Sequence, residues 1–150
     1  MNRDPLTRVL ILCTGNSCRS QLAEALWRHI APDRYVVASA GVEPKDIHPL
    51  TLRVLQEIGV STMGLRSKHV AEFAGQPWDL VITVCDPARD QCPVFPGGVR
   101  HEHWPFDDPP ATVGTEADVL ATFRRVRDQI AERIRGFAEK ARFAPQQEEA

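Results

Sequence analysis

The sequence lacks several features that would assign it to common classes of protein. No uninterrupted apolar run reaches 18 residues, so no segment is long enough to cross a bilayer as a helix. The first residues, MNRDPLTR, contain no hydrophobic core of the kind found in a signal peptide, and we therefore expect a cytoplasmic protein. Lysine and arginine number 18 against 20 aspartates and glutamates, and this net charge of −2 argues against nucleic acid as a partner.

The chain also lacks internal repeats and linkers, which indicates a single unit. Its 150 residues, 43% of them hydrophobic, are enough for one soluble domain spanning residues 1–150. We expect a monomer in which the polar residues 144–150 form a flexible tail. In a reducing cytosol, four cysteines favour redox chemistry or metal binding over structural bridges: Cys13, Cys18, Cys85 and Cys92.

Hydrophobic patterns predict alternating strands and helices. Continuous apolar runs and a short final stretch predict four strands, at 8–13, 35–38, 80–84 and 101–104. Amphipathic spacing predicts helices at 18–30, 49–58, 67–74 and 115–137, the last beginning with a capping box of Thr115 and Asp118. We expect a turn at 39–41 and, because of three prolines and two glycines, a loop at 86–98. This order predicts an α/β fold with a parallel sheet.

Two cysteines stand where predicted strands end. Cys13 closes the first strand, and Cys85 directly follows the third. Ligands of parallel sheets bind beyond the carboxyl ends of the strands, so we expect the two thiols to share a crevice.

The stretch after Cys13 has the composition of an anion-binding loop. Small residues at 14–18 let the backbone curl so that several N–H groups converge, and the following helix adds its own N-terminal N–H groups. Arg19 offers a planar pair of donors to an oxyanion. These groups should lower the pKa of Cys13, and Ser20 can donate a hydrogen bond to the resulting thiolate. The alternative is a buried structural cysteine beside a capping arginine; a Walker loop is ruled out by the missing lysine.

The stretch CTGNSCRSQ closely resembles the thioredoxin-coupled arsenate reductases, which share the fold of low-molecular-weight protein tyrosine phosphatases. The resemblance implies a three-layer arrangement with a four-stranded parallel sheet and helices on both faces. It also implies that Cys13 is the nucleophile, that Arg19 binds the oxyanion and that Ser20 is the hydrogen-bond partner of the thiolate. The substrate would lie in a loop built by the residues Thr14, Gly15, Asn16, Ser17, Cys18 and Arg19.

Three features distinguish the reductases from the phosphatases within this resemblance. Gln21 stands where the phosphatases usually carry proline. The pair Cys85 and Cys92 matches the further thiols of the reductases. The Asp-Pro pair at Asp108 is followed by Pro110, where the phosphatases carry an aromatic residue that frames phosphotyrosine. The resemblance favours Asp108 over the adjacent Asp107 as the general acid.

The resemblance implies a relay of thiol exchange without a tightly bound cofactor. Cys13 attacks arsenate, Cys85 attacks Cys13 and releases arsenite, and Cys92 attacks Cys85. Thioredoxin then reduces the final disulfide, with a low-molecular-weight thiol as the alternative reductant. Because phosphate resembles arsenate, weak phosphatase activity should persist.

Three other functions are open at this stage. The chain could be a tyrosine phosphatase that uses Cys13 alone, or a non-enzymatic phosphate sensor. Zinc could bind at Cys85, Cys92, His101 and His103, although their spacing matches none of the usual short pairings.

One position departs from the family. Some relatives bind potassium near the loop through residues that correspond to Asn16, Glu24 and Ser39 together with an acidic side chain. Lys68 falls at that acidic position, and we expect its ammonium to replace the cation.

Overall fold

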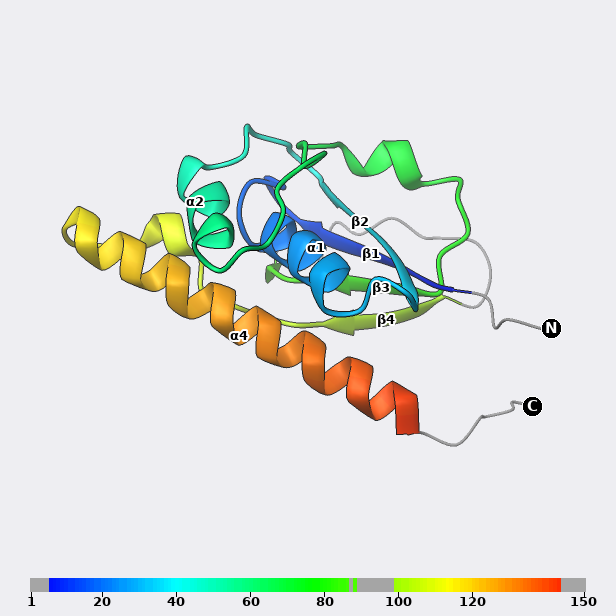
Figure 1. The fold of residues 1–150 in the computed structure, drawn as a ribbon. Coiled ribbons are helices and arrows are strands. Elements are labelled where there is room, and N and C mark those ends of the chain that lie inside the picture. The colour runs from blue at the N-terminus through cyan, green and yellow to red at the C-terminus, as the bar shows by residue number, and fades with distance from the viewer. Residues whose placement is uncertain (1–5, 87, 89–98, 144–150) are drawn as a thin grey trace.

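Four parallel strands form the centre of the protein in a computed structural model, which describes residues 6–86, 88 and 99–143. The strands are β1 (Thr7–Cys13), β2 (Tyr35–Gly41), β3 (Leu80–Thr83) and β4 (Arg100–His103). They lie side by side in the order β2-β1-β3-β4, and every neighbouring pair is parallel (Figure 1). The predicted α/β class with a four-stranded parallel sheet is confirmed.

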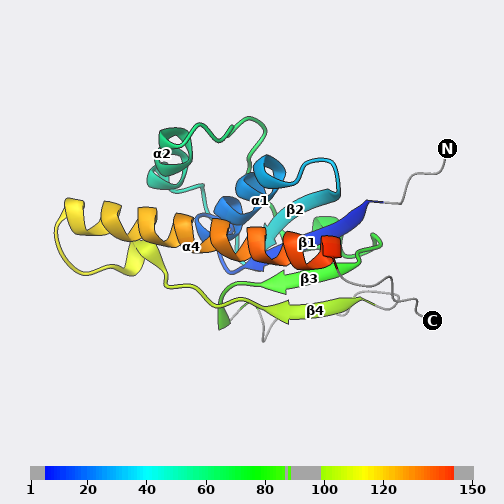
Figure 2. The same cartoon turned by 60° about the horizontal axis from the view of Figure 1, so that its bottom comes forward.

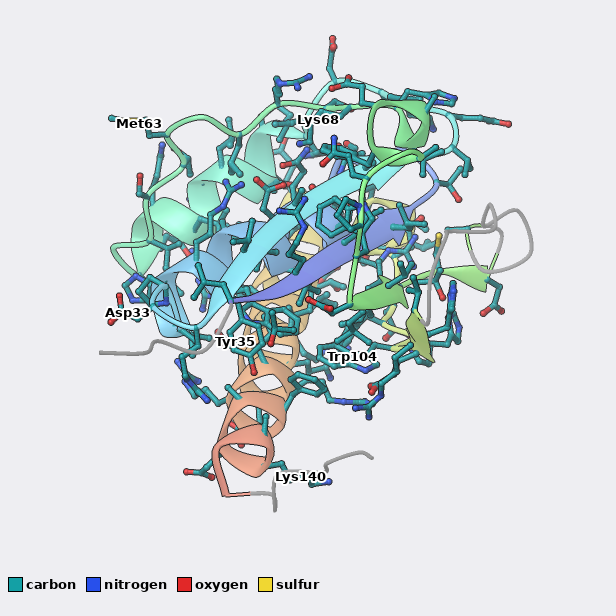
Figure 3. All side chains as sticks on the ribbon, turned by 90° about the vertical axis from the view of Figure 1, so that its right-hand side faces the viewer. Asp33, Tyr35, Met63, Lys68, Trp104 and Lys140 are labelled. Atoms are coloured by element: carbon teal, nitrogen blue, oxygen red, sulfur yellow. The ribbon has the colours of Figure 1, made fainter. Side chains whose placement is uncertain are left out.

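Helices form the outer layers. Helix α1 (Arg19–Ile30) packs against the long helix α4 (Glu116–Phe143) on one face of the sheet, with α2 (Pro49–Glu57) beside them (Figure 2). The short 3-10 helix η1 (Val70–Phe73) lies over the other face (Figure 3). A second 3-10 turn, η2 (Pro109–Ala111), precedes α4. No helix in the described part of the chain is long and apolar enough to span a membrane.

The central position of β1 explains its sequence. Residues Val9 to Cys13 are all buried, because β1 has a strand on each side and layers on both faces. Beneath α4, the rings of Trp27 and Trp104 stack with centroids 5.7 Å apart, and Phe137 meets both at an angle. The same cluster includes Tyr35, the first residue of β2, whose ring meets that of Trp27 with centroids 5.2 Å apart.

Several predicted boundaries are wrong for tertiary reasons. β2 continues through the predicted turn at 39–41, because Ser39 and Gly41 pair with Ile11 and Cys13 of β1. The helix predicted at 67–74 is the shorter η1, and α4 extends six residues beyond Phe137. Within the predicted loop 86–98, Asp86 and Ala88 have helical backbone. Cys92 and the tail 144–150 lie outside the described residues.

The capping box of α4 is confirmed. The backbone N–H of Thr115 donates to the Asp118 carboxylate at 2.9 Å, and the N–H of Asp118 donates to the Thr115 hydroxyl at 3.1 Å.

Candidate active site

The loop between β1 and α1 is supported from outside by the chain that follows β2. Backbone N–H groups of Glu43 and Lys45 donate to the carbonyl oxygens of Thr14 and Gly15, both at 2.8 Å. Because these carbonyls are bound on the outer side, the N–H groups of the loop can serve an anion inside it. A side chain at Gly41 would bring its Cβ within 2.5 Å of the Thr14 carbonyl oxygen, so glycine is required there for the close approach.

Asn16 holds the loop from within. It is fully buried and adopts a left-handed backbone with φ of 49°. Its amide nitrogen donates to the hydroxyls of Ser20 at 2.8 Å and Ser39 at 2.9 Å. Gln21 donates both to the backbone oxygen and to the side-chain oxygen of Asn16, each at 3.0 Å. Proline at position 21 would lack this side-chain donor. The glutamine that distinguishes this sequence from the phosphatases therefore contributes directly to holding Asn16.

A buried ion pair continues this network. One carboxylate oxygen of Glu24 accepts from the Ser39 hydroxyl at 2.6 Å and lies 3.5 Å from the Lys68 ammonium. That ammonium also donates to the Arg66 carbonyl at 2.6 Å, and the Lys68 backbone N–H donates to Asn16. Burial lowers the pKa of Lys68, while Glu24 opposes this. With the ammonium between Glu24 and the Arg66 carbonyl, these residues do not fit a potassium ion.

Arg19 begins α1 and extends across the mouth of the loop. One terminal nitrogen donates to the Phe106 carbonyl at 3.0 Å, and the other lies 3.6 Å from Asp108. The Nε atom is buried without a partner in the described structure. An oxyanion in the loop would supply the missing acceptor.

Cys85 lies in the same cavity as the loop. This cavity has a volume of about 580 Å³, and its lining includes Cys13, Arg19, Cys85 and Asp108. The Cys85 sulfur is 3.2 Å from the Thr14 hydroxyl, and the thiols of Cys85 and Cys13 line the same cavity. The expected meeting of the two thiols at the strand ends is therefore present in the structure.

The thiols of Cys13 and Cys85 titrate as a pair, and the interaction between them favours the ionised form of Cys85. Its pKa falls to about 5, because Cys13 and then Thr14 donate hydrogen bonds to its thiolate. The prediction of a lowered pKa for Cys13 is wrong in this arrangement. The hydrogen bond with Cys85 and burial raise the pKa of Cys13, and they outweigh the opposing effects of Arg19 and the Thr14 backbone.

The two adjacent aspartates have different surroundings. Asp107 pairs with Arg125 on α4 at 3.1 Å and has 72% of its side chain exposed. Asp108 faces the cavity together with Pro110. This geometry favours Asp108 as the proton donor and leaves a proline, not an aromatic ring, at the cavity wall.

The remaining predicted loop residues fill supporting positions. Ser20 is buried and accepts from Asn16, which leaves its hydroxyl proton free; its bond to Cys13 stays a prediction. Ser17 donates to the Asp46 carbonyl. Burial raises the pKa of Cys18 to about 12, so its thiol is unreactive at neutral pH.

Sequence reasoning missed three residues that line the cavity: Lys45, His48 and Asp86. Lys45 and His48 follow the end of β2 and carry no motif, and Asp86 directly follows Cys85. His48 also accepts the backbone N–H of Leu50 at 3.1 Å and so caps α2. The sequence could have indicated these cavity residues by their position, because they follow the carboxyl end of a strand next to β1.

The alternative of a zinc site receives no support from the described residues. Both ring nitrogens of His103 have partners, Thr83 at 2.8 Å and Asp86 at 2.9 Å. No metal-binding group of three histidine, cysteine or acidic side chains occurs in residues 6–86, 88 and 99–143. Cys92 lies outside that range.

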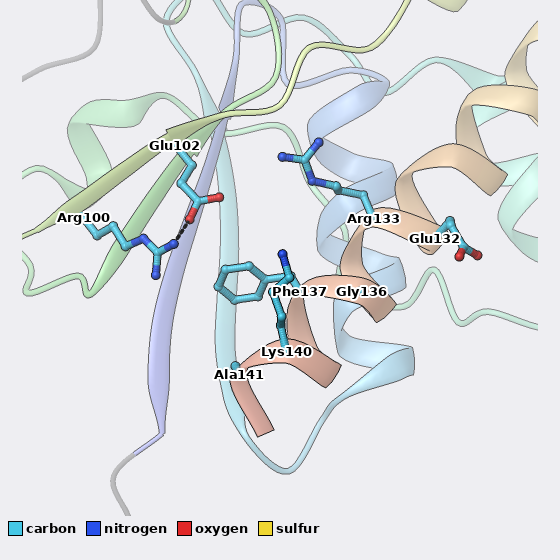
Figure 4. A pocket seen from close by; sticks show the side chains of 8 residues that line it. All are labelled: Arg100, Glu102, Glu132, Arg133, Gly136, Phe137, Lys140 and Ala141. Carbon is cyan, nitrogen blue, oxygen red and sulfur yellow. Dashed lines mark ion pairs between the residues drawn. The ribbon is translucent and has the colours of Figure 1, made fainter. Parts of the chain in front are cut away.

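A second cavity lies between the edge strand β4 and the C-terminal half of α4, and residues of both elements line it (Figure 4). On β4, Arg100 pairs with Glu102, and its guanidinium lies over the ring of Phe137 on α4. This cavity contains none of the residues of the loop after Cys13.

Known proteins share this chain's sequence and fold. The family model for low molecular weight phosphotyrosine protein phosphatase matches residues 8–147. The arsenate reductase of Bacillus subtilis strain 168 is 41% identical over 131 residues, which cover 87% of this chain and 94% of the relative.

Solved structures agree with the sequence relatives. An arsenate reductase in the phosphate binding state has a TM-score of 0.71 at 28% identity, over 90% of this chain and 98% of its own. The thioredoxin-dependent arsenate reductase of Corynebacterium glutamicum has a TM-score of 0.72 at 29% identity, over 95% of this chain and 65% of its own. The chain therefore belongs to the low molecular weight phosphotyrosine protein phosphatase family and, within it, to the arsenate reductases.

Proposed function

We propose that this protein reduces arsenate to arsenite through a relay of Cys13, Cys85 and Cys92, and that thioredoxin regenerates it. The observation that carries the proposal is the position of the Cys85 sulfur, which lies in the oxyanion cavity against Thr14 and Cys13. A phosphatase needs no second thiol at this place, whereas a relay requires one.

Arsenate binds first, held by the loop N–H groups and by Arg19. Cys13 then forms a bond to arsenic, and its proton passes to the neighbouring Cys85 thiolate. Asp108 donates a proton to the departing oxygen, which leaves as water.

Electrons move in the second step. After losing its proton, Cys85 attacks the Cys13 sulfur, so that a disulfide forms and the arsenic–sulfur bond breaks. The electron pair of that bond stays on arsenic, which changes from the +5 to the +3 state and leaves as arsenite. Two sulfurs have then lost the two electrons that arsenic has gained.

Regeneration completes the cycle. Cys92 attacks Cys85, frees Cys13 and leaves a Cys85–Cys92 disulfide for thioredoxin to reduce. Cys92 lies outside the described part of the chain. Its role in the relay is supported by the resemblance of the sequence to the arsenate reductases. The thioredoxin-dependent relative from Corynebacterium glutamicum supports the choice of reductant.

Tyrosine phosphatase activity should be a weak side reaction. The cradle suits phosphate as well as arsenate, but Pro110 lines the cavity where the phosphatases carry an aromatic residue that frames a phosphotyrosine ring.

A coupled assay tests the proposal. NADPH should be consumed only when arsenate, thioredoxin, thioredoxin reductase and the protein are all present. Cys92→Ser should release one arsenite per protein molecule and then stop, while its slow hydrolysis of p-nitrophenyl phosphate continues unchanged. Continuous arsenite production by Cys92→Ser at the parent rate would exclude the relay.

A further inference from the structure

His103 connects the two sides of the chain around Cys85. It ends β4 directly opposite Thr83, the last residue of β3. Its Nδ1 atom is 2.8 Å from the Thr83 hydroxyl, and its Nε2 atom is 2.9 Å from a carboxylate oxygen of Asp86. With the ring proton on Nε2, His103 accepts from Thr83 and donates to Asp86, so both nitrogens are satisfied.

Among the described residues, Val84 makes the last backbone hydrogen bond to the sheet before Cys85. The N–H of Val84 donates to the Leu12 carbonyl at 2.9 Å, and the N–H of Trp104 donates to the Thr83 carbonyl at 2.8 Å. Beyond Val84 the chain leaves the sheet. The bond from His103 to the carboxylate of Asp86 therefore holds the side chain of the residue that directly follows Cys85.

His103 is better protected from water than its partner. Its side chain is 20% exposed, whereas that of Asp86 is 69% exposed. The ring is held on β4 by its buried neighbour Thr83 and provides a fixed point to which the more exposed carboxylate is attached. The rotation of the chain at Cys85 is restricted on both sides of the residue as a result.

We propose that His103 is a positioning residue for the relay: by joining Thr83 and Asp86, it holds the Cys85 sulfur where it can attack Cys13. This inference rests on the proposed function and adds a residue to it. His103 is not among the residues that line the oxyanion cavity, and it acts through its hydrogen bond to Asp86. It acts in the second step alone, in which the disulfide forms and arsenic receives the electron pair.

The test isolates that step in the Cys92→Ser background, where the reaction stops at the Cys13–Cys85 disulfide. Rapid-quench samples after one equivalent of arsenate are analysed for arsenite and, by mass spectrometry, for the disulfide. Asp86→Ala and His103→Ala should each slow disulfide formation by about tenfold, the effect of losing one hydrogen bond to a charged group. Asp86→Asn retains an acceptor oxygen and should recover most of the rate.

Further variants separate positioning from general damage. His101→Ala changes an exposed histidine on the same strand and should leave the rate unchanged. Inorganic phosphate should bind His103→Ala as tightly as its parent, because His103 does not line the oxyanion cavity, whereas Asp86 does. The double variant of Asp86 and His103 should be as slow as either single variant.

The outcomes distinguish the two proposals. If the Cys92→Ser parent forms the disulfide and Asp86→Ala does so equally fast, the positioning role is wrong and the relay stands. If the rate losses of the two single variants multiplied in the double variant, the positioning role of His103 would also be wrong, because the two side chains would then act independently. If the parent forms no Cys13–Cys85 disulfide, the relay fails and the positioning role fails with it.

Discussion

Replacement of Lys68 by methionine tests whether the buried ammonium takes the place of a loop cation. The side chains of Lys68 and Glu24 are 7% and 2% exposed, and their charged atoms lie 3.5 Å apart. Methionine retains the bulk of the side chain but removes the charge. The backbone N–H of residue 68, which donates to Asn16, remains in place.

The expected loss of stability follows from the partners that Glu24 keeps. Removal of one member of a buried ion pair typically costs about 3 to 5 kcal/mol, because the remaining charge loses its compensation. Here Glu24 retains Arg28 and the Ser39 hydroxyl. We therefore expect Lys68→Met to lower the free energy of unfolding by about 2 to 3 kcal/mol. At a urea m-value of about 2 kcal/mol/M, the midpoint falls by about 1 to 1.5 M.

A double-mutant cycle in urea measures the pair itself. Glu24→Gln combined with Lys68→Met removes both charges, so the double variant should lose less stability than the sum of the single variants. Strict additivity, or a loss below about 0.5 kcal/mol in Lys68→Met, would refute the reasoning. The parent should also reduce arsenate equally fast in potassium and sodium chloride; a strong rise with potassium would contradict replacement of the cation by Lys68.

Two further predictions concern the thiol pair and the loop. Thiolate absorbance at 240 nm should rise through a midpoint near pH 5, because Cys85 is protonated below its pKa of about 5 and ionised above it. Cys85→Ser should abolish this step and lower the pKa of Cys13, whose largest raising cause is the hydrogen bond with Cys85; a step that persists in the variant contradicts the assignment. Gly41→Ala should weaken phosphate binding by at least about tenfold in calorimetry, because its Cβ would displace the loop backbone at Thr14. Gly75→Ala, whose Cβ meets nothing within 4 Å, is the matched control, and equal affinities in both variants would show that the loop tolerates the displacement.

Local patterns in the sequence were sufficient for the elements and for the nucleophilic loop. β1 and α1 begin and end within one residue of their predicted bounds, because a continuous apolar run and a helical stripe are properties of neighbouring residues. The spacing of Cys13 and Arg19 around small residues likewise indicated an oxyanion cradle without knowledge of the remaining chain. The Gln21 signal was also local, as are its hydrogen bonds to Asn16, whereas its bond to the Arg66 carbonyl depends on the tertiary structure.

Only the tertiary structure decided which distant residues meet at the loop and what charge they carry. Cys85 reaches Cys13 because β3 lies beside β1, and this contact reverses the predicted shift of the Cys13 pKa. The choice of Asp108 over Asp107 depends on Arg125 of α4, and the anchor of Asp86 depends on the register between β3 and β4. The physical reason is common to all of them: ionisation and hydrogen bonding depend on the few ångströms around a group, and in a parallel sheet those neighbours come from remote parts of the chain.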